Sequence, residues 1–128
     1  MKVEYLHSGK VLPATLPFSE AARVGDTLYL SGQLGIAPGT MSLVPGGIMG
    51  ESRQIMENIR TVLEAHGSSM QGLVKCTVFL ADMAEWAAFN EVYKTFFDGR
   101  YPARSALGAN GLALGARAEV ECIAVVGG

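Results

Sequence analysis

The chain has few charged residues and lacks most of the motifs that carry enzyme chemistry. Asp, Glu, Lys and Arg make up 17% of its 128 residues, against about 25% in an ordinary soluble domain. No nucleophile elbow, P-loop or GxGxxG motif occurs, and its His and Cys residues form no HxxxH or CxxC pair. These absences exclude the common serine-hydrolase, nucleotide-binding and zinc designs. We therefore expect neither a metal nor a cofactor.

Signals for membranes, secretion and nucleic acid are also missing. No stretch approaches the roughly 18 apolar residues of a membrane span, and residues 1–7 contain no apolar segment typical of secretion. The net charge of −2 gives no positive surface for nucleic acid or an anionic membrane. Cys76 and Cys122 lie in apolar runs and suggest no disulfide framework. We predict a cytoplasmic protein in which both cysteines are small buried side chains.

The balance of apolar and charged residues points to self-association. Apolar residues make up 49% of the chain, and Gly is frequent in addition. The length fits one domain with its own core, so we treat residues 1–128 as a single domain. A domain of this size has a large surface, and this chain has few charges to cover it. We therefore expect part of that surface to be buried against further copies of the chain.

Hydrophobic periodicity and turn residues predict both strands and helices. The expected elements are a hairpin over 23–30, a helix over 48–66, a strand over 73–80, a helix over 82–98, and strands over 103–109 and 117–126. Gly25 and Asp26 supply the hairpin turn, and the Gly- and Pro-rich residues 35–47 form a loop. This order predicts an α+β fold in which two helices cover one face of a mixed sheet. The other face is left for another subunit to cover.

The second predicted helix has a clear beginning and a clear apolar face. Asp82 is the expected N-cap, and Glu85 completes the pattern of a capping box. Its apolar stripe, which predicts the face packed on the sheet, consists of Trp86, Phe89, Tyr93, Phe96 and Phe97. Neither histidine has an expected partner, and His66 is placed beside the negative end of the first helix.

Arg104, Glu119 and Glu121 are the residues whose chemistry goes beyond folding. The two glutamates share one face of the last strand, because alternate residues of a strand do. If the last two strands are neighbours, Arg104 lies across from one of these carboxylates. From the residues alone, the preferred interpretation is a cross-strand salt bridge worth ~0.2–1 kcal/mol. The alternative is a small catalytic site, in which the guanidinium binds a substrate carboxylate and a glutamate moves protons.

Several short segments resemble one known family. They are residues 17–21 (PFSEA), 30–33 (LSGQ), Asn58, 75–78 (KCTV), 89–93 (FNEVY), 102–105 (PARS) and 119–121 (EVE). In this order they resemble the RidA family, also called YjgF or L-PSP endoribonuclease, from about residue 13 to residue 125. The Pro-Ala-Arg-Ser block followed by Glu-x-Glu is the most specific part.

The resemblance implies a fold, an assembly and an activity. The implied fold is chorismate-mutase-like, and the implied assembly is a homotrimer whose sheets form a barrel, with sites in the clefts between subunits. The implied activity is that of an enamine/imine deaminase. Such an enzyme hydrolyses 2-aminoacrylate-type acids, released by pyridoxal-phosphate enzymes, to 2-oxo acids and ammonia. The implied partner is thus a small imino or 2-oxo acid.

The resemblance also assigns roles to residues. It makes Arg104 and Glu119 catalytic: Arg104 binds the substrate carboxylate, and Glu119 positions the attacking water. Glu121 matches a second acidic position with a structural role. The full set expected to bind substrate is Arg104, Gly32, Ser31, Phe18, Asn90 and Ala106. For Asn90, satisfying the local backbone is an equally good interpretation.

Two positions depart from the family pattern. Phe18 stands where many members have Tyr, which removes a hydroxyl near the expected pocket. Ala106 stands where relatives often have a reactive cysteine, so a thiol role there is excluded.

Two other functions stay open at this point. The same arginine would serve a module that binds 2-oxo acids without turnover. The ribonuclease activity in the family's older name would need a basic groove lined by aromatic residues, which this composition does not provide.

Overall fold

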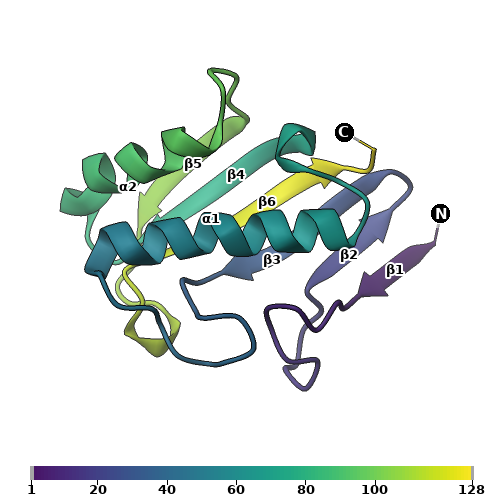
Figure 1. Ribbon diagram of the computed structural model, residues 1–128, viewed down its shortest axis with the longest axis horizontal. Helices are drawn as coiled ribbons and strands as arrows, with labels where there is room; N and C mark the ends of the chain where they lie inside the picture. The colour runs from purple at the N-terminus through teal and green to yellow at the C-terminus, as the bar shows by residue number, and fades with distance from the viewer. Residues whose placement is uncertain (1, 128) are drawn as a thin grey trace.

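Figure 1 shows a computed structural model of the protein, which describes residues 2–127. The strands are β1 (Val3–Leu6), β2 (Ala21–Val24), β3 (Thr27–Gln33), β4 (Leu73–Leu80), β5 (Ala103–Gly108) and β6 (Ala118–Val125). The helices are α1 (Gly47–Ala65) and α2 (Trp86–Tyr93), and short 3₁₀ turns lie at Met70–Gly72, Met83–Glu85, Lys94–Phe96 and Ala113–Gly115. The six strands form one sheet in the order β1-β2-β3-β6-β4-β5.

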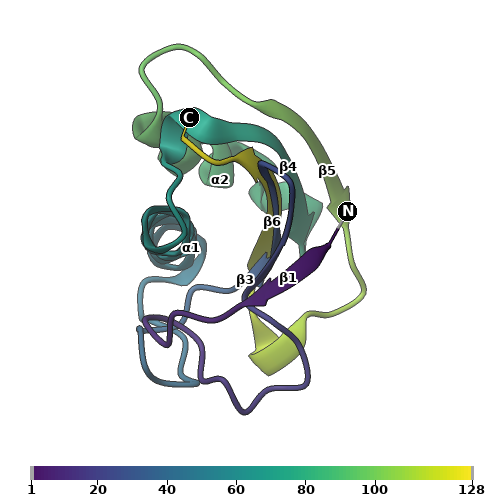
Figure 2. The ribbon, with the colours of Figure 1, turned by 90° about the vertical axis from the view of Figure 1, so that its right-hand side faces the viewer.

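The sheet is mixed, and both helices lie on the same side of it, as predicted. Only the β4–β5 pair is parallel among the strand pairs of residues 2–127. Figure 2 shows the sheet curving around α1 and α2, which both lie on its concave side. A parallel pair needs a crossover, and α2 supplies it between β4 and β5.

The predicted hairpin and first helix are confirmed. Gly25 adopts a positive φ of 59° between β2 and β3, which only a residue without a Cβ does at little cost. The residues of α1 that face the sheet are fully buried, and they recur at helical spacing: Ile55, Met56, Ile59, Val62 and Leu63. Among residues 2–127, no helix combines the length and the apolarity that crossing a membrane requires.

β6 lies at the centre of the sheet, and its two faces differ as the sequence predicts. Its alternate residues Ala118, Val120, Cys122 and Ala124 are buried under the helices. The residues between them, Glu119 among them, point to the opposite face.

The second helix departs from the prediction at both ends. Asp82 accepts a hydrogen bond from the Ala84 amide at 2.9 Å, so it caps the 3₁₀ turn before α2. Glu85 does not complete a capping box, because its carboxylate binds the Arg117 guanidinium at 2.7–3.1 Å. The regular helix ends at Tyr93 rather than near residue 98, and a 3₁₀ turn follows. The chain thus changes from an α-helix to the narrower 3₁₀ turn before the loop that leads into β5.

Two strand details were not predicted. β1 pairs with β2 at the edge of the sheet, although no strand was predicted before residue 23. Val74, an apolar residue near the start of β4, is 48% exposed. The register between β4 and β6 shifts between Leu73 and Lys75, which turns this side chain away from the core.

A buried hydrogen bond gives His66 the partner that the sequence did not supply. Its Nε2 contacts the Glu20 carboxylate, and both side chains are largely buried. The Ser8 hydroxyl donates to the same carboxylate at 2.8 Å. This cluster ties the N-terminal segment and the start of β2 to the end of α1.

We predict that Glu20→Ala lowers the free energy of unfolding by ~1–3 kcal/mol, because the Ser8 and His66 side chains lose their buried acceptor. Urea denaturation measures this, with Glu4→Ala, an exposed change on β1, as the control. Equal stability of the two variants would show that the cluster contributes nothing.

Candidate functional site

The sequence-predicted site residues fall into two groups that the sheet separates. β4 lies between β5 and β6, so Arg104 has neither Glu119 nor Glu121 beside it. Arg104 is in register with Cys76, which is fully buried under the helices. Glu119 alternates with the buried residues of β6 and points to the opposite face. The cross-strand salt bridge preferred from the residues alone is therefore wrong.

The Arg104 guanidinium packs on three aromatic rings of α2. Its guanidinium carbon is 4.7 Å from the ring centre of Tyr93, 5.7 Å from that of Phe89 and 6.0 Å from that of Trp86. Within residues 2–127, no carboxylate forms an ion pair with this guanidinium, and no hydrogen bond engages it. Ring contacts hold the group in place and leave its N–H donors available. It is thus able to bind an incoming anion.

Asn90 and Ala106 belong to the same group. Asn90 follows Phe89 and lies one helical turn after Trp86, so it shares this side of α2. Its Oδ1 is buried and has no hydrogen-bond partner within the described chain, so this oxygen does not satisfy the local backbone. Buried acceptors without partners are rare and mark places where a ligand or water binds. Ala106 lies two residues after Arg104 on the same face of β5, and its small side chain leaves space there.

The side chains of Tyr93, Cys76 and Cys122 lie on the core side of Arg104. Cys76 and Cys122 are buried free thiols, as predicted, and their sulfur atoms are 3.2 Å apart. The pKa of Cys122 is raised well above its usual range, because its thiol is hydrogen-bonded to Cys76 and is buried. Burial also raises the pKa of Tyr93, so this hydroxyl keeps its proton. The pKa of Cys76 is lowered, chiefly by its hydrogen bond with Cys122 and to a smaller degree by the charge of Arg104. Among residues 2–127, no carboxylate forms an ion pair with Arg104 in this cluster.

Glu119 forms the second group, together with Gly32 and Phe18. A Cβ built on Gly32 would overlap the Glu119 carboxylate. Only glycine at position 32 therefore leaves room for this carboxylate where it lies. Phe18, Gly32 and Glu119 line one pocket of about 300 Å³. Its remaining lining residues are apolar: Leu12, Leu16, Leu34, Ile36, Met41, Ala113 and Leu114. Arg104 does not line this pocket.

The surroundings of Glu119 favour its protonated form. Burial raises the pKa of this carboxyl, and the nearby negative charge of Glu121 raises it further. Groups that exchange protons during a reaction often have pKa values shifted in this way. Glu119 is thus suited to taking up a proton and giving it back.

Ser31 positions this second group through its backbone contacts. Its hydroxyl donates to the Ser19 carbonyl at 2.6 Å, and its amide donates to the Glu20 carbonyl at 3.1 Å. These bonds fix the segment that carries Phe18 against β3. Because the Glu20 side chain also binds His66, the wall of the pocket is anchored to α1. Sequence reasoning missed this role of Glu20, since its partner lies 46 residues away.

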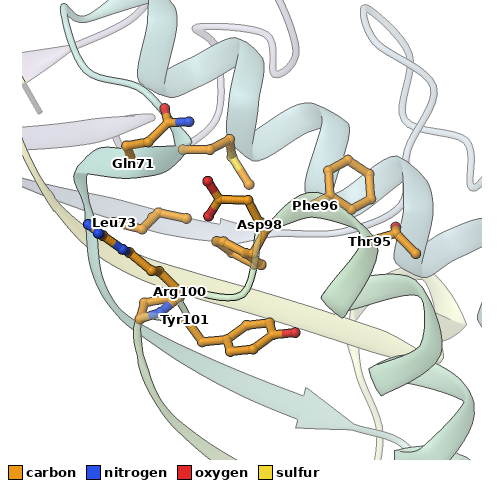
Figure 3. Close-up of a pocket in the computed structure, with 10 residues that line it drawn as sticks. Gln71, Leu73, Thr95, Phe96, Asp98, Arg100 and Tyr101 are labelled. Carbon is orange, nitrogen blue, oxygen red and sulfur yellow. The ribbon is translucent and has the colours of Figure 1, made fainter.

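A larger pocket of about 540 Å³ lies elsewhere, beside the start of β4 (Figure 3). Its lining residues are Met70, Gln71, Leu73, Thr95, Phe96, Phe97, Asp98, Arg100, Tyr101 and Pro102. None of the predicted site residues is among them. We therefore place the candidate site by its chemistry, at Arg104 and Glu119, and not by cavity size. In the part of the chain that the structure describes, no cluster of His, Cys, Asp or Glu could hold a metal ion.

Comparison with known proteins identifies the family. The sequence profile of the family described as Endoribonuclease L-PSP matches residues 9–126. The chain belongs to this family. The L-PSP match covers β2 to β6 and includes both groups of candidate site residues.

Individual members of the L-PSP family are similar over nearly their full length. The 2-iminobutanoate/2-iminopropanoate deaminase of Mus musculus is 45% identical over 116 residues, which cover 90% of this chain and 86% of the mouse protein. The crystal structure of yeast Mmf1 has a TM-score of 0.91 and 34% identity, covering 98% of this chain and 99% of that one. That of E. coli TdcF with bound serine has a TM-score of 0.88 and 31% identity, covering 95% and 98%.

We predict that Gly32→Ala lowers kcat by about a hundredfold, because the new methyl group displaces the Glu119 carboxylate and small misplacements are costly in catalysis. Steady-state kinetics on an imino acid measures this. Gly108→Ala is the control, since its Cβ would meet chiefly the exposed and movable Met83 side chain. Normal turnover by the Gly32 variant would mean that the position of Glu119 does not matter.

Proposed function

We propose that the protein hydrolyses small 2-imino acids to 2-oxo acids and ammonia. The observation that carries this proposal is the guanidinium of Arg104, which packs on aromatic rings and has no ion-pair partner among residues 2–127, together with the Glu119 carboxyl, whose pKa is raised by burial. The mouse protein, which shares 45% identity, is named as a deaminase of imino acids of this kind. The E. coli relative TdcF was crystallised with serine, a small amino acid that carries a carboxylate. Both relatives support a small carboxylic acid as the ligand.

Arg104 binds the substrate carboxylate in this proposal. A guanidinium presents two parallel N–H donors that match the two oxygens of a carboxylate. The rings of Trp86, Phe89 and Tyr93 hold the guanidinium plane, so little side-chain freedom is lost when the ligand binds. The unpartnered Oδ1 of Asn90 is an acceptor for an N–H or a water beside that ligand.

Glu119 carries the chemistry. Its carboxylate takes a proton from a water molecule as the water oxygen adds to the imine carbon. Glu119 gives that proton to the nitrogen, which makes an adduct with one hydroxyl and one amino group. The carboxylate then passes the hydroxyl proton to the amino group, the C–N bond breaks, and ammonia leaves as the carbonyl of the 2-oxo acid forms. A pKa raised by burial and by Glu121 favours both halves of this transfer. No cofactor is needed for these steps.

The two groups meet, in this proposal, between copies of the chain in a homotrimer. Within one chain the sheet lies between Arg104 and Glu119, so one chain cannot present both to one small ligand. The uncovered face of the sheet carries a cross-strand row of side chains, Tyr5, Ala22, Tyr29 and Ile123. Tyr5 is 71% exposed and Tyr29 is 49% exposed. Exposed apolar area of this kind favours a second copy as its cover.

We predict that Arg104→Ala lowers kcat/KM for an imino acid by about a hundredfold or more, since a charged hydrogen-bonding partner of the carboxylate is lost. Arg104→Lys keeps the charge but loses the paired donors, so its kcat/KM lies between the two. A dehydratase that releases 2-aminoacrylate supplies the substrate, and its decay is followed. Arg100→Ala, an exposed change at the other pocket, is the control. If the Arg104→Ala variant removes 2-aminoacrylate as fast as the wild type does, the assigned mechanism is contradicted.

The pH profile gives a separate prediction for Glu119. Its carboxylate is the active form, so kcat/KM falls as the pH falls through the raised pKa of this group. Glu121→Gln removes one cause of the raised pKa of Glu119. The fall of kcat/KM at acidic pH therefore moves to lower pH in this variant.

Glu119→Gln keeps the affinity for 2-oxo acids and lowers turnover over the whole range. If kcat/KM of the Glu121→Gln variant falls at the same acidic pH as in the wild type, the role given to this carboxyl is contradicted. Loss of 2-oxo acid binding in the Glu119→Gln variant would contradict it as well. Binding without turnover in the wild type would instead support a 2-oxo acid sensor.

A further inference from the structure

We propose that Cys76 and Cys122 are a modification site, at which hydrogen peroxide forms a reversible disulfide within one chain and thereby weakens ligand binding at Arg104. Formation of the disulfide is independent of the proposed function. Its effect on binding rests on that function, because it takes Arg104 as the group that holds the ligand carboxylate.

The sheet holds the two cysteines directly opposite each other. β4 and β6 are antiparallel neighbours, and their register pairs Cys76 with Cys122. Both thiols are free and lie under the helices, and their sulfur atoms are 3.2 Å apart. Residues paired in this way have Cα atoms about 4.5–5.5 Å apart, which is within the range that a disulfide spans. A bond between the two sulfur atoms therefore needs little movement of the backbone.

The chain contains no other cysteine. Any disulfide within one chain must therefore join Cys76 to Cys122. A thiol that is oxidised in the presence of a close second thiol forms a disulfide instead of taking up more oxygen. The pair thus has the arrangement that makes oxidation reversible.

The two thiols differ in a way that assigns the order of the steps. Cys76 is in register with Arg104 on the neighbouring strand β5. The pKa of Cys76 is lowered, chiefly by its hydrogen bond with Cys122 and further by the charge of Arg104. The thiolate is the reactive form of cysteine, and a cationic neighbour favours it. The pKa of Cys122 is raised, so this thiol keeps its proton until Cys76 has reacted.

The reaction balances with hydrogen peroxide as the oxidant. The Cys76 thiolate attacks one oxygen, the O–O bond breaks, and the leaving hydroxide takes up the proton that the thiol lost. The product is a sulfenic acid and one water. The Cys122 sulfur then attacks the Cys76 sulfur, the Cys122 proton goes to the departing hydroxyl, and a second water leaves as the S–S bond forms. Two thiols are oxidised, and one peroxide is reduced to two waters.

Burial sets the rate of this reaction and the size of the oxidant. Cys76 is 0% exposed and Cys122 is 3% exposed. Hydrogen peroxide is little larger than water, and the half-buried Arg104 side chain is the neighbour whose movement opens the shortest way to Cys76. We expect oxidation to be slower than that of an exposed thiol, and bulky alkylating reagents to react only after unfolding.

The disulfide affects Arg104 because β4 lies between β6 and β5. When the Cys76 sulfur moves toward Cys122, it moves away from Arg104 and from the Tyr93 ring. The centre of that ring is 4.7 Å from the guanidinium carbon, and Cys76 lies beside both groups. Loss of this packing lets the ring and the guanidinium shift, and small displacements of a binding group are costly.

The first test treats the full chain with hydrogen peroxide. Intact-mass spectrometry should show a chain lighter by two hydrogen atoms, and dithiothreitol should restore its mass. Alkylation in denaturant should label both cysteines before the treatment and neither after it. Added oxygen atoms on the cysteines, a covalent dimer on a non-reducing gel, or two thiols that stay free would each overturn the inference.

Two alanine variants serve as matched controls, since alanine keeps a small apolar side chain in the core. Cys122→Ala should gain oxygen at Cys76 and lose no hydrogen, because the second thiol is missing. Cys76→Ala should keep its mass and its affinity for pyruvate, a small 2-oxo acid, at the peroxide concentration that oxidises the wild type. A peroxide-dependent loss of affinity in Cys76→Ala would assign the effect to another side chain and overturn the inference.

Calorimetry with pyruvate measures the effect on Arg104 after the peroxide has been removed. We expect the Kd of the oxidised protein to be about tenfold higher than that of the reduced protein, and dithiothreitol to reverse the change. Unchanged or tighter binding would overturn this effect. A disulfide in a protein that hydrolyses no imine would retain the modification site and reject the deaminase. Imine hydrolysis in a protein that forms no disulfide would do the reverse.

Discussion

β4 separates Arg104 from Glu119, and the two side chains leave the sheet on opposite faces. This separation divides the candidate site into two groups of residues. In one group the Arg104 guanidinium packs on aromatic rings of α2. In the other, the Glu119 carboxyl lies beside Gly32 in an apolar pocket. Each group is half of a site that could hydrolyse an imino acid. A small ligand can reach both only if a second chain brings its Glu119 to the Arg104 of the first.

The proposed division of the site between chains would also give the small number of charged residues a physical reason. Charged residues are sparse in the sequence, and the face of the sheet without helices exposes Tyr5 and Tyr29. Such a face is poorly solvated alone and stabilises an assembly when it is covered. Association would bury this area and complete the site in the same step. Turnover would then depend on the concentration of assembled protein.

Local patterns in the sequence predicted both helices, the strands from β2 to β6 and most of their buried faces, but not how distant parts meet. They missed β1, and Trp86, predicted to pack on the sheet, is 45% exposed. The alternation along β6 and the helical spacing of Ile55, Ile59 and Val62 were sufficient, because each pattern is read within one element. The place of β4 between β5 and β6 follows from a crossover, which no local pattern encodes. The salt bridge expected for Arg104 failed for that reason. The Glu20–His66 pair was missed because its partners are 46 residues apart, and no spacing rule links them.

The most direct test of the shared site is to mix two inactive variants. Arg104→Ala and Glu119→Gln chains, unfolded and refolded together, should regain activity in mixed assemblies, whereas either variant refolded alone stays inactive. If each site takes Arg104 from one chain and Glu119 from its neighbour, random mixing of equal amounts restores about one site in four. If both residues act from the same chain, every site in the mixture lacks one of them. A mixture with no more activity than its two components would therefore contradict the account.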